Sequence, residues 1–336
     1  MNKRPPESQV PSCLVVPDDM AQDRADRLLA DLLSGVMTRS SLSHLLKDGF
    51  ITWEGKQVKP STTLKPGQEV VIDFESRREP LSVSMDTRSQ PVIIFEDDHV
   101  IVLDKPAGLV VHPGAGPRSQ TLMDILVESR PSMVGIGESG RWGIVHRLDK
   151  DTSGVMVVAK TLIAHEDLSA QFRRHSIGRV YLALVRGNPG LDSGVIDKEL
   201  GRSRSDRKKI STVTQKGRQA TTSWRVQQRY GPVSLLEIRP QTGRTHQIRV
   251  HLASVGLPIL GDQVYGTRVR KLASGDKIFR MLTAILKRQA LHAAILAFKH
   301  PVSGLFIEFS SDLPGDMLEA IKICVTISKM EVESDL

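Results

Sequence analysis

Hydrophobic positions in the first 75 residues recur first at helical and then at strand spacing. A predicted amphipathic helix covers residues 21–34, and its apolar stripe comprises Ala25, Leu28, Leu29, Leu32 and Leu33. Leu42, Leu45 and Leu46 predict a second helix, which would end at Gly49. Short strands separated by polar turns follow at 50–53, 57–58 and 70–74. The pattern predicts a compact unit of two helices and a hairpin over residues 18–75.

Sequence without periodicity lies on both sides of this unit and at the end of the chain. Residues 1–17 are rich in proline and hold few apolar residues, which predicts disorder. Residues 76–90 lack periodicity and contain Arg, Ser, Asp and Pro, which predicts a linker. The last residues, 326–336, are predicted to form a loose acidic tail.

From residue 91 onward, strand-like and helix-like patterns follow each other. Strands are predicted at 92–95, 100–103, 144–145, 155–158, 179–185, 221–227 and 233–238, and helices at 121–130, at 162–174 and after 245. These elements predict a second, larger domain over residues 91–325. Two domains also suit a length of 336 residues.

The charge balance favours an anionic partner but does not require one. The chain has 46 Lys and Arg against 38 Asp and Glu, a net charge of +8. Nucleic acid is a natural partner for such a chain, and an ordinary basic enzyme would fit equally well. Cys13 and Cys324 lie near opposite ends, without disulfide or metal spacing, which suits the reducing cytoplasm. We find no membrane span and no signal peptide in the pattern.

One polar turn between two apolar runs stands out as a candidate site. Residues 146–151 place five ionisable groups in six positions, with Asp149 in the middle. An aspartate in a turn usually just caps backbone N–H groups. Such crowding beside apolar strands is more typical of a functional site, and a rigid mount suits a catalytic carboxylate.

The string His-Arg-Leu-Asp-Lys-Asp-Thr-Ser-Gly at 146–154 resembles the motif of the RluA-type pseudouridine synthases. Further similar segments are Lys105–Pro113, Tyr181–Val185, Thr242–His251, Pro258–Asp262, Val264–Gly266 and Arg288–Ala293. The resemblance spans about Val92 to Phe309. The helix, helix, hairpin order before it resembles the S4 RNA-binding module. Together these imply an α+β protein with a small helix-rich S4 domain, followed by a catalytic domain built on a mixed, mostly antiparallel sheet flanked by helices.

The resemblance also implies an activity, the isomerisation of uridine to pseudouridine in RNA. Asp149 would be the nucleophile, Arg244 would form an ion pair with it, and Tyr181 would lie against the uracil. Without the resemblance, Tyr181 would be read as a half-buried core residue. Arg147 would fill the stack vacated by the flipped nucleotide, and Leu291 would pack beneath the uracil. His146 would support the turn or contact phosphate.

No cofactor or metal is expected, because the reaction has no net redox change. The glycine-rich segment at 114–116 lacks the features of a phosphate-binding loop. His246 and His251 are five residues apart, about 140° around a helix, so they would not share a metal.

Several basic residues are candidate contacts to RNA phosphates, and a solvated surface is the alternative for all of them. They are Arg24, Arg27, Arg39, Lys47 and Lys56 in the S4-like unit, and Arg207, Lys208 and Lys209 in a second basic patch over 197–218. The expected partner is structured RNA, ribosomal RNA of the large subunit before transfer RNA. The protein is expected to be a cytoplasmic monomer without membrane contact.

Two other functions remain open from the sequence. A non-catalytic RNA-binding or ribosome-assembly factor would keep the fold and make no use of Asp149. A metal-dependent nucleic-acid hydrolase would need clustered carboxylates around two ions about 3.5–4 Å apart. The joint presence of Asp149, Tyr181 and Arg244 favours the isomerase.

Overall fold

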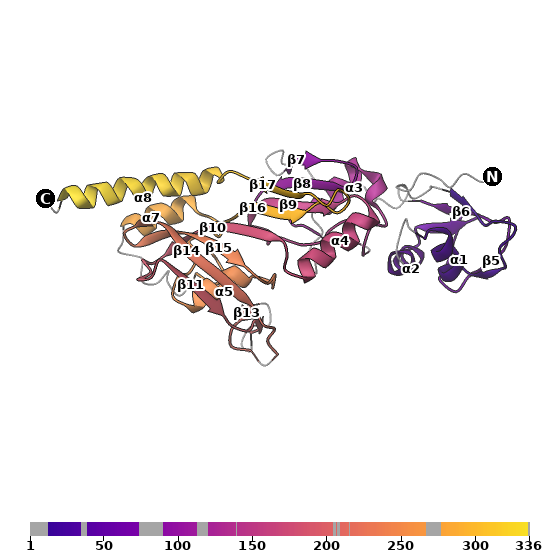
Figure 1. Cartoon of the computed structure of the whole chain (residues 1–336), viewed down its shortest axis with the longest axis horizontal. Helices are drawn as coiled ribbons and strands as arrows, with labels where there is room; N and C mark the ends of the chain where they lie inside the picture. The colour runs from indigo at the N-terminus through magenta and orange to yellow at the C-terminus, as the bar shows by residue number, and fades with distance from the viewer. Residues whose placement is uncertain are drawn as a thin grey trace.

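The computed structural model describes residues 13–34, 39–73, 90–112, 120–138, 140–203, 206, 209–214, 216–266 and 277–334. Expectations for residues 1–12, for 76–89, for the glycine-rich segment 114–116, and for Arg207 and Lys208 lie outside these residues. The described chain is elongated, with the N-terminal unit at one end and the C-terminal helix at the other (Figure 1).

The N-terminal unit combines two helices with short strands. Its elements are β1 (Cys13–Val15), β2 (Asp23–Arg24), α1 (Ala25–Leu32), α2 (Arg39–Asp48), β3 (Ile51–Trp53), β4 (Lys56–Gln57), β5 (Thr63–Leu64) and β6 (Glu69–Ile72). The larger sheet has the order β1-β6-β3-β4. Disorder up to residue 17 was therefore a wrong prediction for its last part, because Cys13 pairs with Val71 and Val16 is fully buried.

The predicted leucine stripes form the core of this unit. Leu28 and Leu29 of α1 pack in one cluster with Leu42 and Leu45 of α2. The same cluster includes Met123, Val134 and Trp142 from the following part of the chain. The N-terminal unit thus has its own core, which is continued by apolar side chains of the larger part.

The larger part is built on one mixed, mostly antiparallel sheet, as expected for the fold class. Its strands, in the order β11-β14-β15-β10-β16-β9-β8-β7 with β17 beside β16, are β7 (Val92–Glu96), β8 (Val100–Lys105), β9 (Ser153–Ala159), β10 (Gly178–Arg186), β11 (Ser193–Asp197), β14 (Thr221–Tyr230), β15 (Val233–Pro240), β16 (Leu291–Lys299) and β17 (Phe306–Ser310). Strands β9 and β16 pair in parallel and the other pairs are antiparallel. A separate hairpin consists of β12 (Gly201–Arg202) and β13 (Ile210–Ser211).

Helices flank this sheet. They are α3 (Leu122–Ser129), α4 (Leu162–Arg173), α5 (Gln247–Ser254), α7 (Lys277–Ile285) and α8 (Gly315–Ser334), with a 3₁₀ turn at Pro131–Met133. The loose tail was a wrong prediction, because α8 remains helical through Ser334 (Figure 1). Met317, Ala320 and Cys324 are fully buried at helical spacing and Ile327 packs against the same core, so the apolar stripe of the helix extends into the predicted tail. No helix in the described ranges is long and apolar enough to cross a membrane.

The parallel contact between β9 and β16 positions the candidate turn. Gly154, the second residue of β9, pairs with Ala293 of β16 and has a φ of 121°. A Cβ at this position would lie 2.2 Å from the carbonyl oxygen of Ala293. Only glycine permits this approach, so it fixes the start of β9 and the turn before it against the centre of the sheet.

Candidate active site

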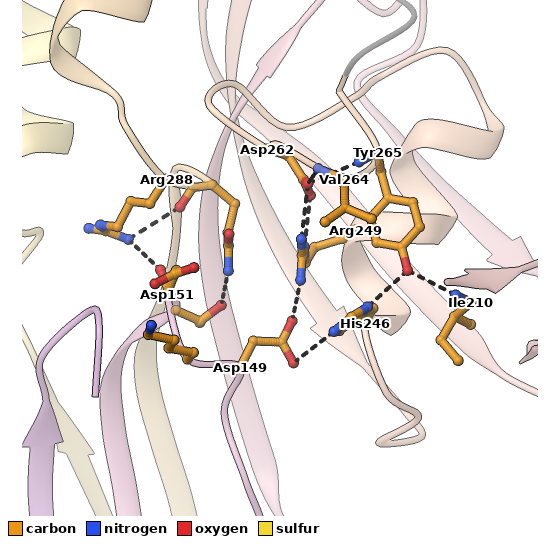
Figure 2. A network of polar contacts seen from close by, with 12 residues as sticks. Asp149, Asp151, Ile210, His246, Arg249, Asp262, Val264, Tyr265 and Arg288 are labelled. Carbon is orange, nitrogen blue, oxygen red and sulfur yellow. Dashed lines mark hydrogen bonds and ion pairs between the residues drawn. The ribbon is translucent and has the colours of Figure 1, made fainter. Parts of the chain in front are cut away.

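Backbone hydrogen bonds hold the turn that carries Asp149. The N–H of Thr152 donates to the Asp149 carbonyl at 3.1 Å, and the N–H of Gly108 donates to the Lys150 carbonyl at 2.9 Å. The Arg288 guanidinium donates to the Asp151 carbonyl at 3.1 Å (Figure 2). Hydrogen bonds from several parts of the chain therefore fix the backbone around Asp149, as expected for a residue that must hold one orientation.

A buried lysine also holds the turn that carries Asp149. The Lys105 ammonium is fully buried and donates to the carbonyls of Pro106, Leu109 and Lys150 at 2.8, 2.9 and 3.0 Å. Three carbonyl acceptors match the three N–H groups of an ammonium. Burial lowers the pKa of Lys105 to about 7, against a smaller opposite effect of Asp151. The motif segment that begins at Lys105 thus serves as a foundation for the Asp149 turn.

The Asp149 carboxylate is paired with Arg249. Nη1 of Arg249 donates to Oδ2 of Asp149 at 2.9 Å. The other side of the guanidinium binds Asp262 through Nε at 2.7 Å and Nη2 at 2.9 Å. Figure 2 shows Arg249 between the two carboxylates. One buried arginine thus links the candidate nucleophile to a second, fully enclosed acid.

The expected ion pair between Arg244 and Asp149 was therefore a wrong prediction. Arg244 lies in the exposed turn before α5, lines the cleft, and donates Nε to the Gln219 carbonyl at 3.4 Å. Helix α5 begins only at Gln247, which places Arg249 in its first turn against the sheet. The same motif contains both arginines, and the helix start decides which one faces Asp149.

Burial and charge determine the ionisation of Arg249 and Asp262. Arg249 is 6% exposed, and burial alone would lower its pKa, but the bonds to Asp262 and Asp149 outweigh burial and raise it. Burial would raise the pKa of Asp262, yet Arg249 and the N–H groups of Tyr265 and Val264 lower it. Both groups are therefore charged, and the guanidinium is a permanent cation beside Asp149.

His246 lies on the other side of the Asp149 carboxylate. Its Nε2 is 3.9 Å from Oδ1 of Asp149, and its Nδ1 is 2.8 Å from the Tyr265 hydroxyl. The Tyr265 hydroxyl also accepts the N–H of Ile210 at 3.0 Å (Figure 2). Burial lowers the pKa of His246, against a smaller opposite effect of Asp149 and with an added effect of Arg249. Sequence reasoning gave His246 no role beyond excluding it as a metal ligand.

A cleft of about 100 Å³ opens in front of Asp149. Its lining includes Arg147, Tyr181 and Leu291, which come from the turn, from β10 and from β16. Tyr181 is 9% exposed, and burial raises the pKa of its phenol, so the ring is neutral. Arg147 is exposed at the rim. The fold therefore gathers Asp149, Tyr181, Arg147, Leu291 and, on the exposed side, Arg244 around one cavity.

His146 supports the turn rather than facing the solvent. Its ring stacks on Phe172 of α4 at a centroid distance of 4.5 Å, and its Nε2 accepts the N–H of Val157 at 3.1 Å. Burial, with a contribution from Arg179, lowers the pKa of His146 to about 3. A neutral, stacked imidazole is poorly suited to bind phosphate. Of the two roles expected for His146, the contacts favour support of the turn.

The basic residues expected to contact RNA are not among the residues that line this cleft. Arg24 pairs with Asp26 at 2.8 Å, Arg39 lies 3.8 Å from Asp31, and Lys209 lies 3.7 Å from Asp206. Arg27 and Lys47 belong to α1 and to the end of α2.

In the described ranges, no three His, Cys, Asp or Glu side chains gather as a metal site would require.

Comparisons with known proteins identify the family of this chain. The family described as RNA pseudouridylate synthase matches residues 99–254. The ribosomal large subunit pseudouridine synthase D of Xanthomonas campestris pv. campestris is 42% identical over 309 residues, 90% of this chain and 89% of that protein. The protein of the same name from Pseudomonas aeruginosa is 39% identical over 303 residues, 90% of this chain and 92% of that protein.

A solved structure shows the same fold. Human RNA pseudouridylate synthase domain containing 4 matches 69% of this chain and 92% of its own, with a TM-score of 0.53 and 25% identity. The matched family and these relatives define an enzyme of RNA modification. The chain belongs to the RNA pseudouridine synthase family and is an isomerase that acts on RNA.

Proposed function

We propose that this protein converts uridines of large-subunit ribosomal RNA to pseudouridine, with Asp149 as the nucleophile. The observation that carries the proposal is the Asp149 carboxylate in the cleft, held by the Arg249–Asp262 pair. The names of the bacterial relatives, which cover nine-tenths of the chain, support the choice of RNA. Transfer RNA is the second candidate.

The chemistry needs an ionised carboxylate in a cavity that excludes bulk water. The N1–C1′ bond breaks, the uracil turns, and C5 joins C1′, so no electrons are gained or lost. Asp149 adds to C6 of the ring or attacks C1′ of the ribose, and the two routes require the same groups. In either route the bond to Asp149 breaks again before the product leaves, C5 loses a proton and N1 gains one. Arg249 holds the carboxylate in one orientation through a charge-assisted hydrogen bond. Tyr181 lies against the ring and mediates loss of the C5 proton after reattachment.

The target uridine has to leave its stack to reach Asp149, at a cost of a few kcal/mol. Arg147 is two residues from Asp149, exposed and at the rim of the cleft. Its long planar guanidinium suits the vacated place in the stack. Leu291 provides an apolar floor for the uracil. Arg244, on the exposed side of the cleft, contacts the RNA backbone in this proposal.

The N-terminal unit, proposed as an S4-like module over 18–75, binds structured RNA through its basic face. Arg24, Arg27, Arg39, Lys47 and Lys56 supply charge that positions RNA without reading sequence. The catalytic domain covers residues 91–325. The enzyme acts as a cytoplasmic monomer.

Mapping of pseudouridine in cells tests this function. Carbodiimide-dependent primer extension on large-subunit ribosomal RNA should lose one or more stops when the gene is deleted. The wild-type gene should restore them and Asp149→Asn should not, although Asp149→Asn should bind RNA with nearly unchanged affinity. Restoration by Asp149→Asn would refute the nucleophile. Loss of stops in transfer RNA alone would refute the choice of RNA.

A further inference from the structure

The contacts of His246 and Tyr265 have no part in the chemistry described so far. His246 is one of three non-glycine residues with positive φ in the described chain, with a φ of 54°. It precedes α5 as the N-cap residue and makes no side-chain capping bond there. A strained backbone at a cleft suggests that the side chain is held there for a purpose.

The hydrogen bonds of Tyr265 select one tautomer of His246. The Tyr265 oxygen accepts the N–H of Ile210 at 3.0 Å, and this N–H can only donate. Among the described residues the other hydrogen-bond partner of this oxygen is Nδ1 of His246 at 2.8 Å, so the one phenol proton is assigned to that bond. Nδ1 accepts, so the neutral ring carries its proton on Nε2.

This tautomer suits the position of Asp149. Nε2 of His246 is 3.9 Å from Oδ1 of Asp149, beyond a direct hydrogen bond but within electrostatic reach. An N–H facing a carboxylate is attractive, whereas a lone pair there would be repulsive. Arg249 binds the other oxygen, Oδ2, at 2.9 Å. The carboxylate is therefore confined between a guanidinium and an imidazole N–H.

We propose that His246 is a positioning residue for the Asp149 nucleophile and that the Tyr265 hydroxyl sets its tautomer. Arg249 fixes one carboxylate oxygen and His246 restrains rotation of the other. The Tyr265 ring has a second contact, because Cζ of Arg249 lies 5.2 Å from its centroid. The ring packs on the same arginine, so loss of the hydroxyl alone leaves that packing in place. The proposal rests on Asp149 as nucleophile.

The chain offers a matched set of tyrosine variants, because it has three tyrosines. Tyr265→Phe removes the hydroxyl and keeps the ring on Arg249. Tyr230→Phe is the control, since Tyr230 lies buried at the end of β14 in the hydrophobic core. The substrate is total RNA labelled with 5-tritiated uridine from cells that lack the gene, so the assay does not depend on which RNA is modified.

Single-turnover tritium release gives the rate constant, and filter binding to the same RNA gives Kd. Tyr265→Phe should lower the rate constant roughly ten- to hundredfold, because small displacements of a reacting group cost factors of this size. Kd and the melting temperature should stay near wild type. Tyr230→Phe should keep the wild-type rate constant. A wild-type rate for Tyr265→Phe, or a loss confined to Kd, would overturn the proposal.

Two variants of His246 separate positioning from backbone strain. His246→Gln keeps an amide donor near the Nε2 position, and His246→Asn keeps a polar group near Nδ1 only. Positioning predicts a faster Gln variant. Strain alone predicts a faster Asn variant, because asparagine tolerates positive φ better. An Asn variant as fast as Gln would overturn the role of His246.

Asp149→Asn, run beside them, keeps the two proposals distinguishable. Activity in Asp149→Asn would overturn the nucleophile and this inference together. An inactive Asp149→Asn with a fully active Tyr265→Phe would overturn only the inference.

Discussion

The cleft at Asp149 and the N-terminal unit use charge in opposite ways. Around Asp149, ionic groups form a connected chain of close pairs, from Asp149 through Arg249 to Asp262. In the N-terminal unit the basic side chains surround an apolar core, and the pairs they make, such as Arg39 with Asp31, are exposed. Function in the cleft therefore depends on the placement of single atoms. Binding by the N-terminal unit should depend on the number of charges.

The largest effect outside the nucleophile should come from Asp262, which accepts four donors and has a side chain only 1% exposed. Asp262→Asn removes one of the two charged partners of Arg249, the one that binds Nε and Nη2. Breaking a buried pair costs about 3 kcal/mol or more of unfolding free energy. Activity should fall about a hundredfold, because Arg249 no longer holds Asp149 in place.

Urea unfolding and tritium release measure both effects. Asp192→Asn is the control, since Asp192 pairs with Arg229 at the surface with its side chain 86% exposed. That change should cost less than about 1 kcal/mol. Equal losses of unfolding free energy and of activity in Asp262→Asn and Asp192→Asn would contradict the special position of Asp262.

Lys105→Met should have the next largest effect, a loss of unfolding free energy. It leaves three backbone carbonyls without their donor, at a cost of about 1–3 kcal/mol. The wild type should also show a characteristic pH dependence, because burial lowers the pKa of Lys105 to about 7 in the folded chain.

Between pH 7 and the unfolded pKa of about 10.4, the unfolded chain binds a proton that the folded chain has released. The stability contribution of Lys105 therefore rises with pH across this window. Urea unfolding of wild type and Lys105→Met from pH 6.5 to 9.5 should show this rise in the wild type alone. Parallel curves would show that Lys105 keeps its proton throughout.

The smallest effect on the reaction should come from substitutions in the N-terminal unit, which should change RNA binding only. Replacing Arg27 and Lys47 together by Ser should weaken RNA binding and reduce the slope of log K against log salt by about two, roughly one for each phosphate that is no longer neutralised. The single-turnover rate constant at saturating enzyme should not change. A lower rate constant with the same salt slope would place these residues in the catalytic step.

The motifs predicted that Asp149 and Tyr181 lie at one site, but not which arginine binds the Asp149 carboxylate. Asp149 and Tyr181 each stand in a short contiguous motif, and both line the cleft. Arg244 and Arg249 stand in one motif, and the choice between them depends on where α5 begins. A signal was available, because Arg249 lies between Ile248 and Val250. In the structure Gln247 to Leu252 are all buried, and an arginine among buried residues needs a charged partner.

Other parts of the site depend on long-range contacts that local patterns do not show. Asp262 and Tyr265 stand in segments similar to family segments, but their contacts to Arg249 and His246 arise only when the segment after α5 folds back. Strand β1 has three residues, and its partner Val71 is 58 positions from Cys13. Periodicity predicted α1 and α2 because their leucines recur within one element.

The central claim, that Arg249 holds the nucleophile, is tested most directly by two conservative variants. Lysine keeps the charge but cannot bond both carboxylates as the planar guanidinium does. In single-turnover tritium release, Arg249→Lys should be about a hundredfold slower than wild type and Arg244→Lys within about threefold. A slow Arg244→Lys beside a near-wild-type Arg249→Lys would contradict the account.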